Sequence, residues 1–122
     1  MPFRACVWDL DGTLLGADAR ISQESAALLR HMLDEGLQLA VATARSPATV
    51  VELLRPLGLR TPAVLMTGTM IYDVAHTRCL AATPLARETA AAVCAVLERT
   101  GQEALAYSVK GGHLYVYYKE FA

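Results

Sequence analysis

The chain has 122 residues, 54% of them hydrophobic, and its 11 basic and 12 acidic residues give a formal net charge of −1. This is the length of one ordinary domain, able to bury a core, and without a basic tract we expect no nucleic-acid partner. No apolar stretch approaches the roughly 18 residues of a membrane span and no signal peptide opens the chain, so we expect no membrane partner.

Three cysteines, Cys6, Cys79 and Cys94, lie far apart in the sequence among apolar neighbours. An odd number of widely spaced cysteines favours reduced thiols in the core over disulfides or zinc ligands. The expected location is therefore cytoplasmic.

The first half of the chain alternates predicted strands and helices. Strands are predicted over residues 3–9, 37–43 and 63–66. One helix begins at the N-cap Ser22 and ends at Gly36, and another begins at Ser46 with Pro47 and ends at Gly58. Mostly apolar strands in this order predict an α/β fold with a parallel sheet, helices on both faces, and an active edge at the carboxyl ends of the strands.

The pattern changes after Thr67. Residues 70–74 and 79–82 flank a polar link and predict an antiparallel hairpin. A helix follows from Pro84, and residues 104–109 and 113–118 then bracket Lys110-Gly111-Gly112 as a second hairpin.

The segment 9–13, Asp-Leu-Asp-Gly-Thr, follows the first predicted strand directly. Strand residues i and i+2 point to one face, about 7 Å apart, so Asp9 and Asp11 are expected to share one pocket. Gly12 allows a sharp turn whose N–H groups point at an anion. Asp-Gly-Thr is also common turn chemistry, but a second acid two residues before has no structural need. The segment therefore favours phosphoryl chemistry.

These residues resemble the first motif of the haloacid dehalogenase superfamily of phosphohydrolases. Residues 39–45 (Leu-Ala-Val-Ala-Thr-Ala-Arg) resemble its second motif, and residues 67–73 resemble a stretch typical of the Cof-like sugar-phosphatase branch. The resemblance covers most of residues 3–82. It implies a Rossmann-like core in residues 1–83 and the start of an α+β cap in residues 84–122, with the boundary at Pro84.

The resemblance also implies a mechanism for a Mg²⁺-dependent phosphatase of small phosphorylated metabolites, most often sugar phosphates. Asp9 would attack the phosphate and form an aspartyl-phosphate, while Asp11 would act as the acid and base and stay protonatable. Mg²⁺ would bind the Asp9 carboxylate and the Asp11 backbone carbonyl. The phosphate-binding residues would be Leu10, Gly12, Thr43, Ala44, Arg45 and Gly68.

Some of these assignments have alternatives. Arg45 is as well placed to lie on a solvated loop as to meet phosphate, and Thr43 is also an ordinary β-branched strand end. The branch usually has Asn at Thr67 and Gly at Ala44, which weakens the implied contacts there. We expect His31, His76 and His113 to be solvated or locally bonded, and the tyrosines of the last hairpin to form a packed face.

The sequence lacks two parts of the complete superfamily site. The only lysines are Lys110 and Lys119, both in the last predicted hairpin or beyond it, and no Asp follows Asp73. The third-motif Lys and fourth-motif acids are therefore absent, and the chain looks like a hydrolase truncated within its cap. Exposed apolar surface is then expected, and with it a homodimer or larger assembly.

Three functional hypotheses follow. The chain is a metabolite phosphatase, a non-catalytic remnant that binds Mg²⁺ or phosphate or serves as an interaction module, or another phosphotransfer protein such as a phosphomutase or a receiver. The last is least favoured, because a receiver does not place a second acid in this position.

Overall fold

The computed structural model describes residues 4–118. Phe3 of the first predicted strand, Lys119 and the rest of residues 119–122 lie outside the described residues. The elements, in order, are β1 (Ala5–Trp8), α1 (Gln23–Asp34), β2 (Gln38–Val41), α2 (Pro47–Leu54), β3 (Ala63–Leu65), β4 (Met70–Asp73), β5 (Arg78–Ala82), α3 (Arg87–Thr100), β6 (Ala106–Lys110) and β7 (His113–Tyr117). Short helical turns cover Leu10–Leu14, Arg55–Leu57 and Met66–Gly68.

The sheet confirms the predicted α/β class. Strands β1 and β2 pair in parallel, from Ala5 opposite Gln38 to Trp8 opposite Val41, and an isolated parallel bridge joins Ala42, just after β2, to Val64 in the middle of β3. Strands β3, β4 and β5 pair antiparallel, as predicted for the first hairpin. The carboxyl ends of β1, β2 and β3 therefore meet at one edge.

One face of this sheet carries the hydrophobic core. Leu29 of α1 and Val50 and Leu54 of α2 pack in the same buried cluster as Leu39 and Val41 of β2. Both helices lie on this face because β1, β2 and β3 follow one another across the sheet through crossovers of one hand. Val7 points to the opposite face and is 64% exposed, so among residues 4–118 helices cover one face where the sequence predicted two.

Helix boundaries follow local chemistry. The hydroxyl of Ser22 accepts the N–H of Ser25 at 3.1 Å and caps α1 as predicted. Helix α2 begins at Pro47, whose missing N–H needs no partner there, but the Ser46 side chain makes no capping bond. The chain after α2 turns at Gly58 in the left-handed region, φ 63°.

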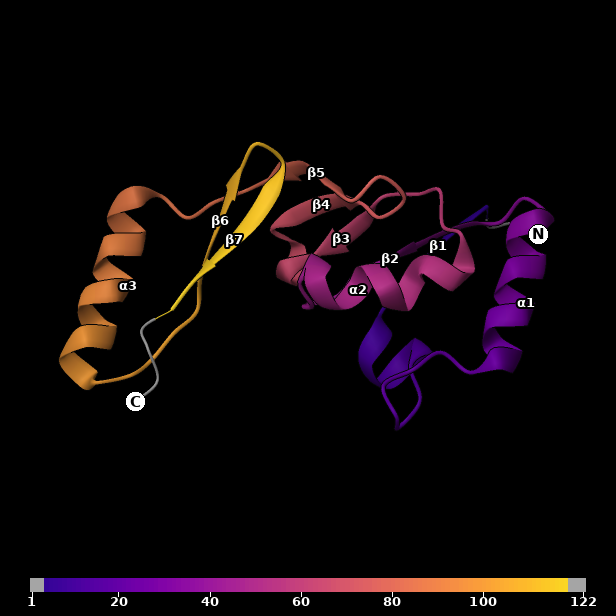
Figure 1. Cartoon of the computed structure of the whole chain (residues 1–122), viewed down its shortest axis with the longest axis horizontal. Coiled ribbons are helices and arrows are strands. Elements are labelled where there is room, and N and C mark those ends of the chain that lie inside the picture. Colours follow the sequence, from indigo (N-terminus) through magenta and orange to yellow (C-terminus); the bar gives the residue numbers. More distant parts are fainter. Residues whose placement is uncertain (1–3, 119–122) are drawn as a thin grey trace.

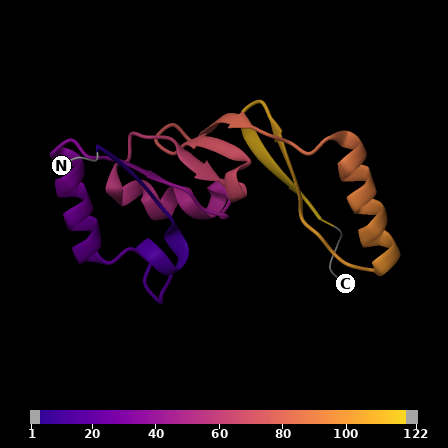
Figure 2. The ribbon, with the colours of Figure 1, turned by 180° about the vertical axis from the view of Figure 1, so that it is seen from behind.

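Helix α3 and the β6–β7 hairpin extend away from the rest of the chain (Figure 1), and the reverse view shows the same separation (Figure 2). No residue of α3 is buried. The hairpin is joined to β5 where the N–H of Cys79 donates to the carbonyl of Gly112 at 3.1 Å. We call α3 with β6 and β7 the outer arm; the predicted domain boundary at residues 83/84, just before it, stays a prediction.

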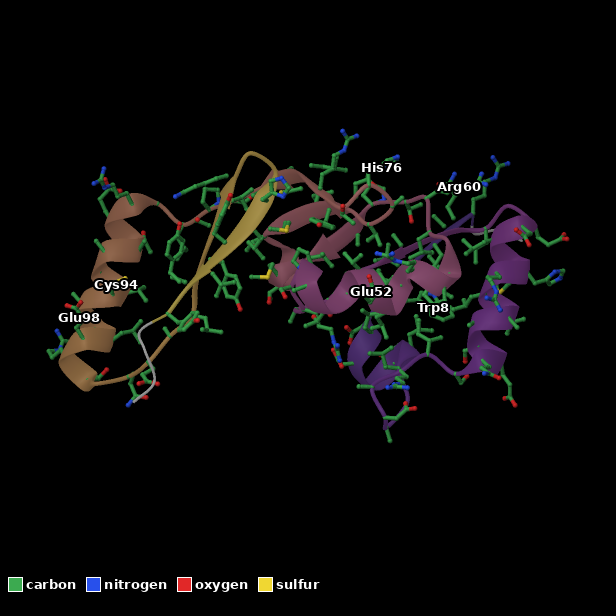
Figure 3. All side chains as sticks on the ribbon, viewed as in Figure 1. Trp8, Glu52, Arg60, His76, Cys94 and Glu98 are labelled. Atoms are coloured by element: carbon green, nitrogen blue, oxygen red, sulfur yellow. The ribbon has the colours of Figure 1, made fainter. Side chains whose placement is uncertain are left out.

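Two expectations about the outer arm were wrong. Tyr107, Tyr115 and Tyr117 are 42–49% exposed and form no packed face, because Val109 and Leu114 are the hairpin residues that contact the core. Cys94 is exposed on α3 (Figure 3) instead of lying in a core, and no other residue of that helix is buried. Cys6 and Cys79 are partly buried, and all three thiols are free.

Candidate phosphate site

Three loops meet at the carboxyl edge of the parallel strands. The N–H of Ala42 donates to Trp8 and that of Thr43 donates to Val64, both at 2.9 Å. The loop after β3 is attached in turn, because Met66 donates to the carbonyl of Arg45 at 3.0 Å. The backbones that follow β1, β2 and β3 are therefore held side by side.

Asp9 and Asp11 reach this edge in a different way from that predicted. Strand β1 ends at Trp8, so Asp11 is not two residues along a strand from Asp9. Instead the chain turns through Asp11 (φ −66°, ψ 125°) and Gly12 (φ 75°). Turn geometry, and not strand alternation, sets the direction of each carboxylate.

The Asp9 carboxylate accepts the backbone N–H of Leu10 at 2.9 Å. The Leu10 side chain is fully buried in the core, which anchors the turn. Because the N–H of Leu10 already donates to Asp9, Leu10 can bind phosphate as predicted only if this hydrogen bond is shared or replaced.

Arg45 makes the most specific side-chain contact of the site. Its Nε donates to Oδ2 of Asp11 at 2.8 Å and its Nη2 donates to Oδ1 at 2.7 Å. This is the two-point geometry in which a guanidinium holds a carboxylate best. The sequence predicted that Arg45 would either bind phosphate or lie on a solvated loop. Its pairing with Asp11 is a third outcome.

This pair changes the charge state of Asp11. The hydrogen bonds from Arg45, more than its charge, hold the pKa of Asp11 below the ordinary aspartate value, and the same contact raises the pKa of Arg45. The expectation that Asp11 lies in surroundings that keep it protonatable is therefore wrong for this state, in which a favoured carboxylate faces a cation.

Thr43 lies at the centre of the edge and is 6% exposed. Its Oγ1 accepts the N–H of Arg45 at 3.2 Å, which leaves its hydroxyl hydrogen available to donate to a phosphate oxygen. Its backbone carbonyl accepts the N–H of Thr67 at 3.2 Å. Ala44 and Gly68 are exposed on the flanking loops, and Gly68 has φ 90°.

The residues present fit part of a magnesium site. Mg²⁺ takes oxygen ligands, often one or two carboxylates with waters and substrate phosphates. The Asp9 carboxylate and the Asp11 carbonyl are such oxygens and belong to one tight turn. Within residues 4–118, no three His, Cys, Asp or Glu side chains gather where they could hold a metal.

The histidines do not contribute to the site. His76 is bonded locally, with Nδ1 2.9 Å from Oδ2 of Asp73, in the β4–β5 turn, as expected. His31 and His113 lie on α1 and β7. A hollow of about 790 Å³ lies at the opposite edge, between the end of α1 and the turn after α2, and no predicted site residue lines it.

The Arg45–Asp11 pair is what sequence reasoning missed. A signal for it exists: each residue lies a few positions beyond the end of its strand, and β1 and β2 are parallel neighbours. A cation and an anion so placed are expected to meet when no ligand separates them.

Comparison with known proteins agrees with this fold. The family model for haloacid dehalogenase-like hydrolases matches residues 6–121. The chain belongs to this family of hydrolases.

Individual relatives are phosphatases. The chain is 35% identical to phosphatase YwpJ of Bacillus subtilis over 53% of this chain and 23% of the relative. It is 33% identical to pyridoxal phosphate phosphatase YbhA of Escherichia coli over 70% of this chain and 31% of the relative. The chain thus spans less than a third of the length of these curated relatives.

Solved structures share the fold. A haloacid dehalogenase-like hydrolase from B. subtilis superposes with a TM-score of 0.77 at 23% identity, over 98% of this chain and 40% of that one. A subclass IIB sugar phosphatase of the same superfamily superposes with a TM-score of 0.71 at 22% identity, over 93% and 44%. The outer arm is included in an alignment that covers nearly all of this chain. No helix among the described residues is long and apolar enough to cross a membrane.

Proposed function

We propose that the chain carries the nucleophile half of a Mg²⁺-dependent phosphatase of small phosphorylated metabolites, most often sugar phosphates. The observation that supports this most is the joining of Asp9 and Asp11 with Thr43 and Arg45 at one strand edge in a chain of this hydrolase family. Two of the relatives are named as phosphatases, one of them of pyridoxal phosphate.

In the proposed reaction the Asp9 carboxylate attacks phosphorus, the bond to the leaving oxygen breaks, and an aspartyl-phosphate forms. Protonated Asp11 gives its proton to the leaving alcohol and then accepts one from the water that hydrolyses the intermediate. Thr43 donates to a phosphate oxygen, with further donors from the turn at Leu10 and Gly12 and from the loops at Ala44, Arg45 and Gly68.

Asp9 and the Asp11 carbonyl would hold Mg²⁺, which when bound offsets the repulsion between the anionic nucleophile and the anionic substrate. Because the described residues supply few metal ligands and no lysine at this edge, we expect slow turnover. Each lost contribution of about 1.4 kcal/mol costs tenfold in rate.

Hydrolysis of an aryl phosphate with Mg²⁺ tests this proposal. Release of phosphate that falls at least about a hundredfold in Asp9→Asn supports it, since a covalent nucleophile has no substitute at that position. Asp18→Asn, in the exposed loop after the turn, is the matched control and keeps the wild-type rate. Equal rates in the wild type and Asp9→Asn contradict the proposal.

A second candidate function is non-catalytic binding of phosphate or Mg²⁺, or of a protein partner. The observation that favours it is the Arg45–Asp11 pair, which holds the acid in its ionised form. Binding of phosphate without any Asp9-dependent turnover selects this alternative.

We also infer a homodimer or larger assembly in the cytoplasm. Large apolar side chains of the outer arm are exposed, including Val93, Val96 and Val116 at 45–46%, and such surface commonly binds a partner. Three free thiols suit a reducing compartment. Light scattering at micromolar concentration tests the assembly, and a monomer contradicts it.

A further inference from the structure

Arg45 has a rigid backbone and a side chain with one partner. Its N–H donates to Thr43 Oγ1 in its own loop and its carbonyl accepts from Met66 in the loop after β3, so its backbone is held on both sides. Within residues 4–118, the hydrogen bonds of its guanidinium all go to the Asp11 carboxylate. The side chain is therefore free to change partner without disturbing the fold.

The competing anion would arrive at the same place. Thr43, whose hydroxyl hydrogen is available, is bonded to the Arg45 backbone, and Asp11 belongs to the same turn as Asp9. A phosphate group bound at this edge meets the guanidinium at short range. Guanidinium groups hold phosphate with the same two-point geometry as carboxylate, and a phosphate dianion carries the greater charge.

The existing pair is not deeply buried. The Arg45 side chain is 26% exposed and that of Asp11 is 56% exposed. Exposed ion pairs contribute little net free energy, so a phosphate at moderate concentration can displace one. A released Asp11 carboxylate is then free to turn toward the ligand.

We propose that Arg45 exchanges between two anions, holding the Asp11 carboxylate in the free chain and passing to the phosphate group when a phosphorylated ligand binds. This inference rests on the proposed phosphate site and adds a regulatory step to it. The ligand on which Asp11 acts is also the ligand that releases Asp11 from Arg45. Arg45 is a phosphate-binding residue in one state and a positioning residue for Asp11 in the other.

Inorganic phosphate, titrated by calorimetry without turnover, tests the exchange. In Asp11→Asn the guanidinium no longer has a competing carboxylate, so phosphate binds about two- to fivefold more tightly, the range that loss of an exposed ion pair allows. Arg45→Gln weakens binding, and Arg45→Lys restores part of it because charge is kept while the two-point geometry is lost.

The double variant separates exchange from simple charge repulsion. In the Arg45→Gln background, the gain in phosphate affinity from Asp11→Asn is expected to fall to that from Asp9→Asn, because only relief of charge repulsion is left. Asp9→Asn is the matched control, because it removes an equal charge from a residue that Arg45 does not contact. Its gain in phosphate affinity is therefore expected to be the same with or without Arg45. An Asp11→Asn gain in phosphate affinity that is as large without Arg45 as with it overturns the proposal.

NMR of the Arg45 Nε–H gives a readout independent of affinity. We expect its resonance to shift on addition of phosphate to the wild type, and to start from a different, solvent-like position in Asp11→Asn. The backbone amide spectrum of each variant reports whether it is folded. An Arg45 resonance that does not move at saturating phosphate overturns the exchange, as does a folded wild type that binds no phosphate. The proposed hydrolysis is tested separately, by the activity of Asp9→Asn.

Discussion

The N–H of Thr67 donates to the carbonyl of Thr43 at 3.2 Å and ties the loop after β3 to the end of β2. Thr67 makes this bond at φ 57°, in the left-handed region, and Met66 before it has φ 53°. A β-branched residue in this region is a strained exception. One edge of the site is therefore built from backbone that Thr does not favour.

Replacing Thr67 with Asn is expected to stabilise the chain. Asn adopts positive φ more readily, so the free energy of unfolding should rise by about 1 kcal/mol. Thermal unfolding measures this as a rise of about 4 °C. Thr89→Asn on exposed α3, where the two residues have similar helix propensity, is the control and shifts the midpoint little. A destabilised Thr67→Asn would show that the hydroxyl matters more than the strain.

The two predicted N-cap serines should respond differently to Ala. Ser22→Ala removes the bond to the N–H of Ser25 and is expected to cost about 1 kcal/mol. Ser46→Ala removes no capping bond and should cost about 0.3 kcal/mol or less. Denaturant unfolding of both variants side by side makes the comparison, and equal losses contradict the cap geometry.

Asp73 links stability to acid pH. Its pKa is lowered, first by the backbone N–H of His76 and then by the His76 side chain, with a smaller contribution from Arg78. A carboxyl whose folded pKa lies below its unfolded value of about 3.9 stabilises the fold above that pH, and the contribution is lost as the pH falls through the folded pKa.

Asp73→Asn should therefore be less stable than the wild type at pH 6, with the difference shrinking as the pH is lowered below about 4. Urea midpoints measured across this range test the sign. Glu103→Gln, in the exposed loop before β6, is the control, for which we expect no comparable narrowing. A gap that widens in acid is the contrary result.

The exposed face of α3 is expected to hold the proposed assembly together. Val93→Lys with Val96→Lys places two charges where apolar surface would be buried, so the assembly should dissociate toward monomer. Sedimentation or light scattering reads the mass. Leu28→Lys, which changes a 60% exposed leucine on α1, is the matched control and should leave the mass unchanged.

Sequence reasoning was most successful where chemistry is local. Ser22, Pro47 and Gly58 mark helix boundaries through capping or backbone preferences within one turn, and Gly111-Gly112 closes the last hairpin. These elements were therefore predicted within a few residues. The contact between Arg45 and Asp11 was not predicted, because it joins residues 34 positions apart and depends on how two loops leave the sheet.

The exposure of the hairpin tyrosines was also not predicted. Strand alternation indicates which hairpin residues share a face, but not whether another element covers that face. Tyr115 and Tyr117 share one side of β7 and both are exposed, since the outer arm contacts the core through Val109 and Leu114.

The uncovered face of the parallel sheet has a thermodynamic consequence. Trp8 packs toward the core while its neighbour Val7 is 64% exposed, so β1, which carries Asp9 at its end, is buried on one side only. Any molecule that binds the Val7 side of the folded chain and not the unfolded one raises the free energy of unfolding by mass action. The melting temperature of the chain therefore measures how fully the Val7 face of β1 is occupied.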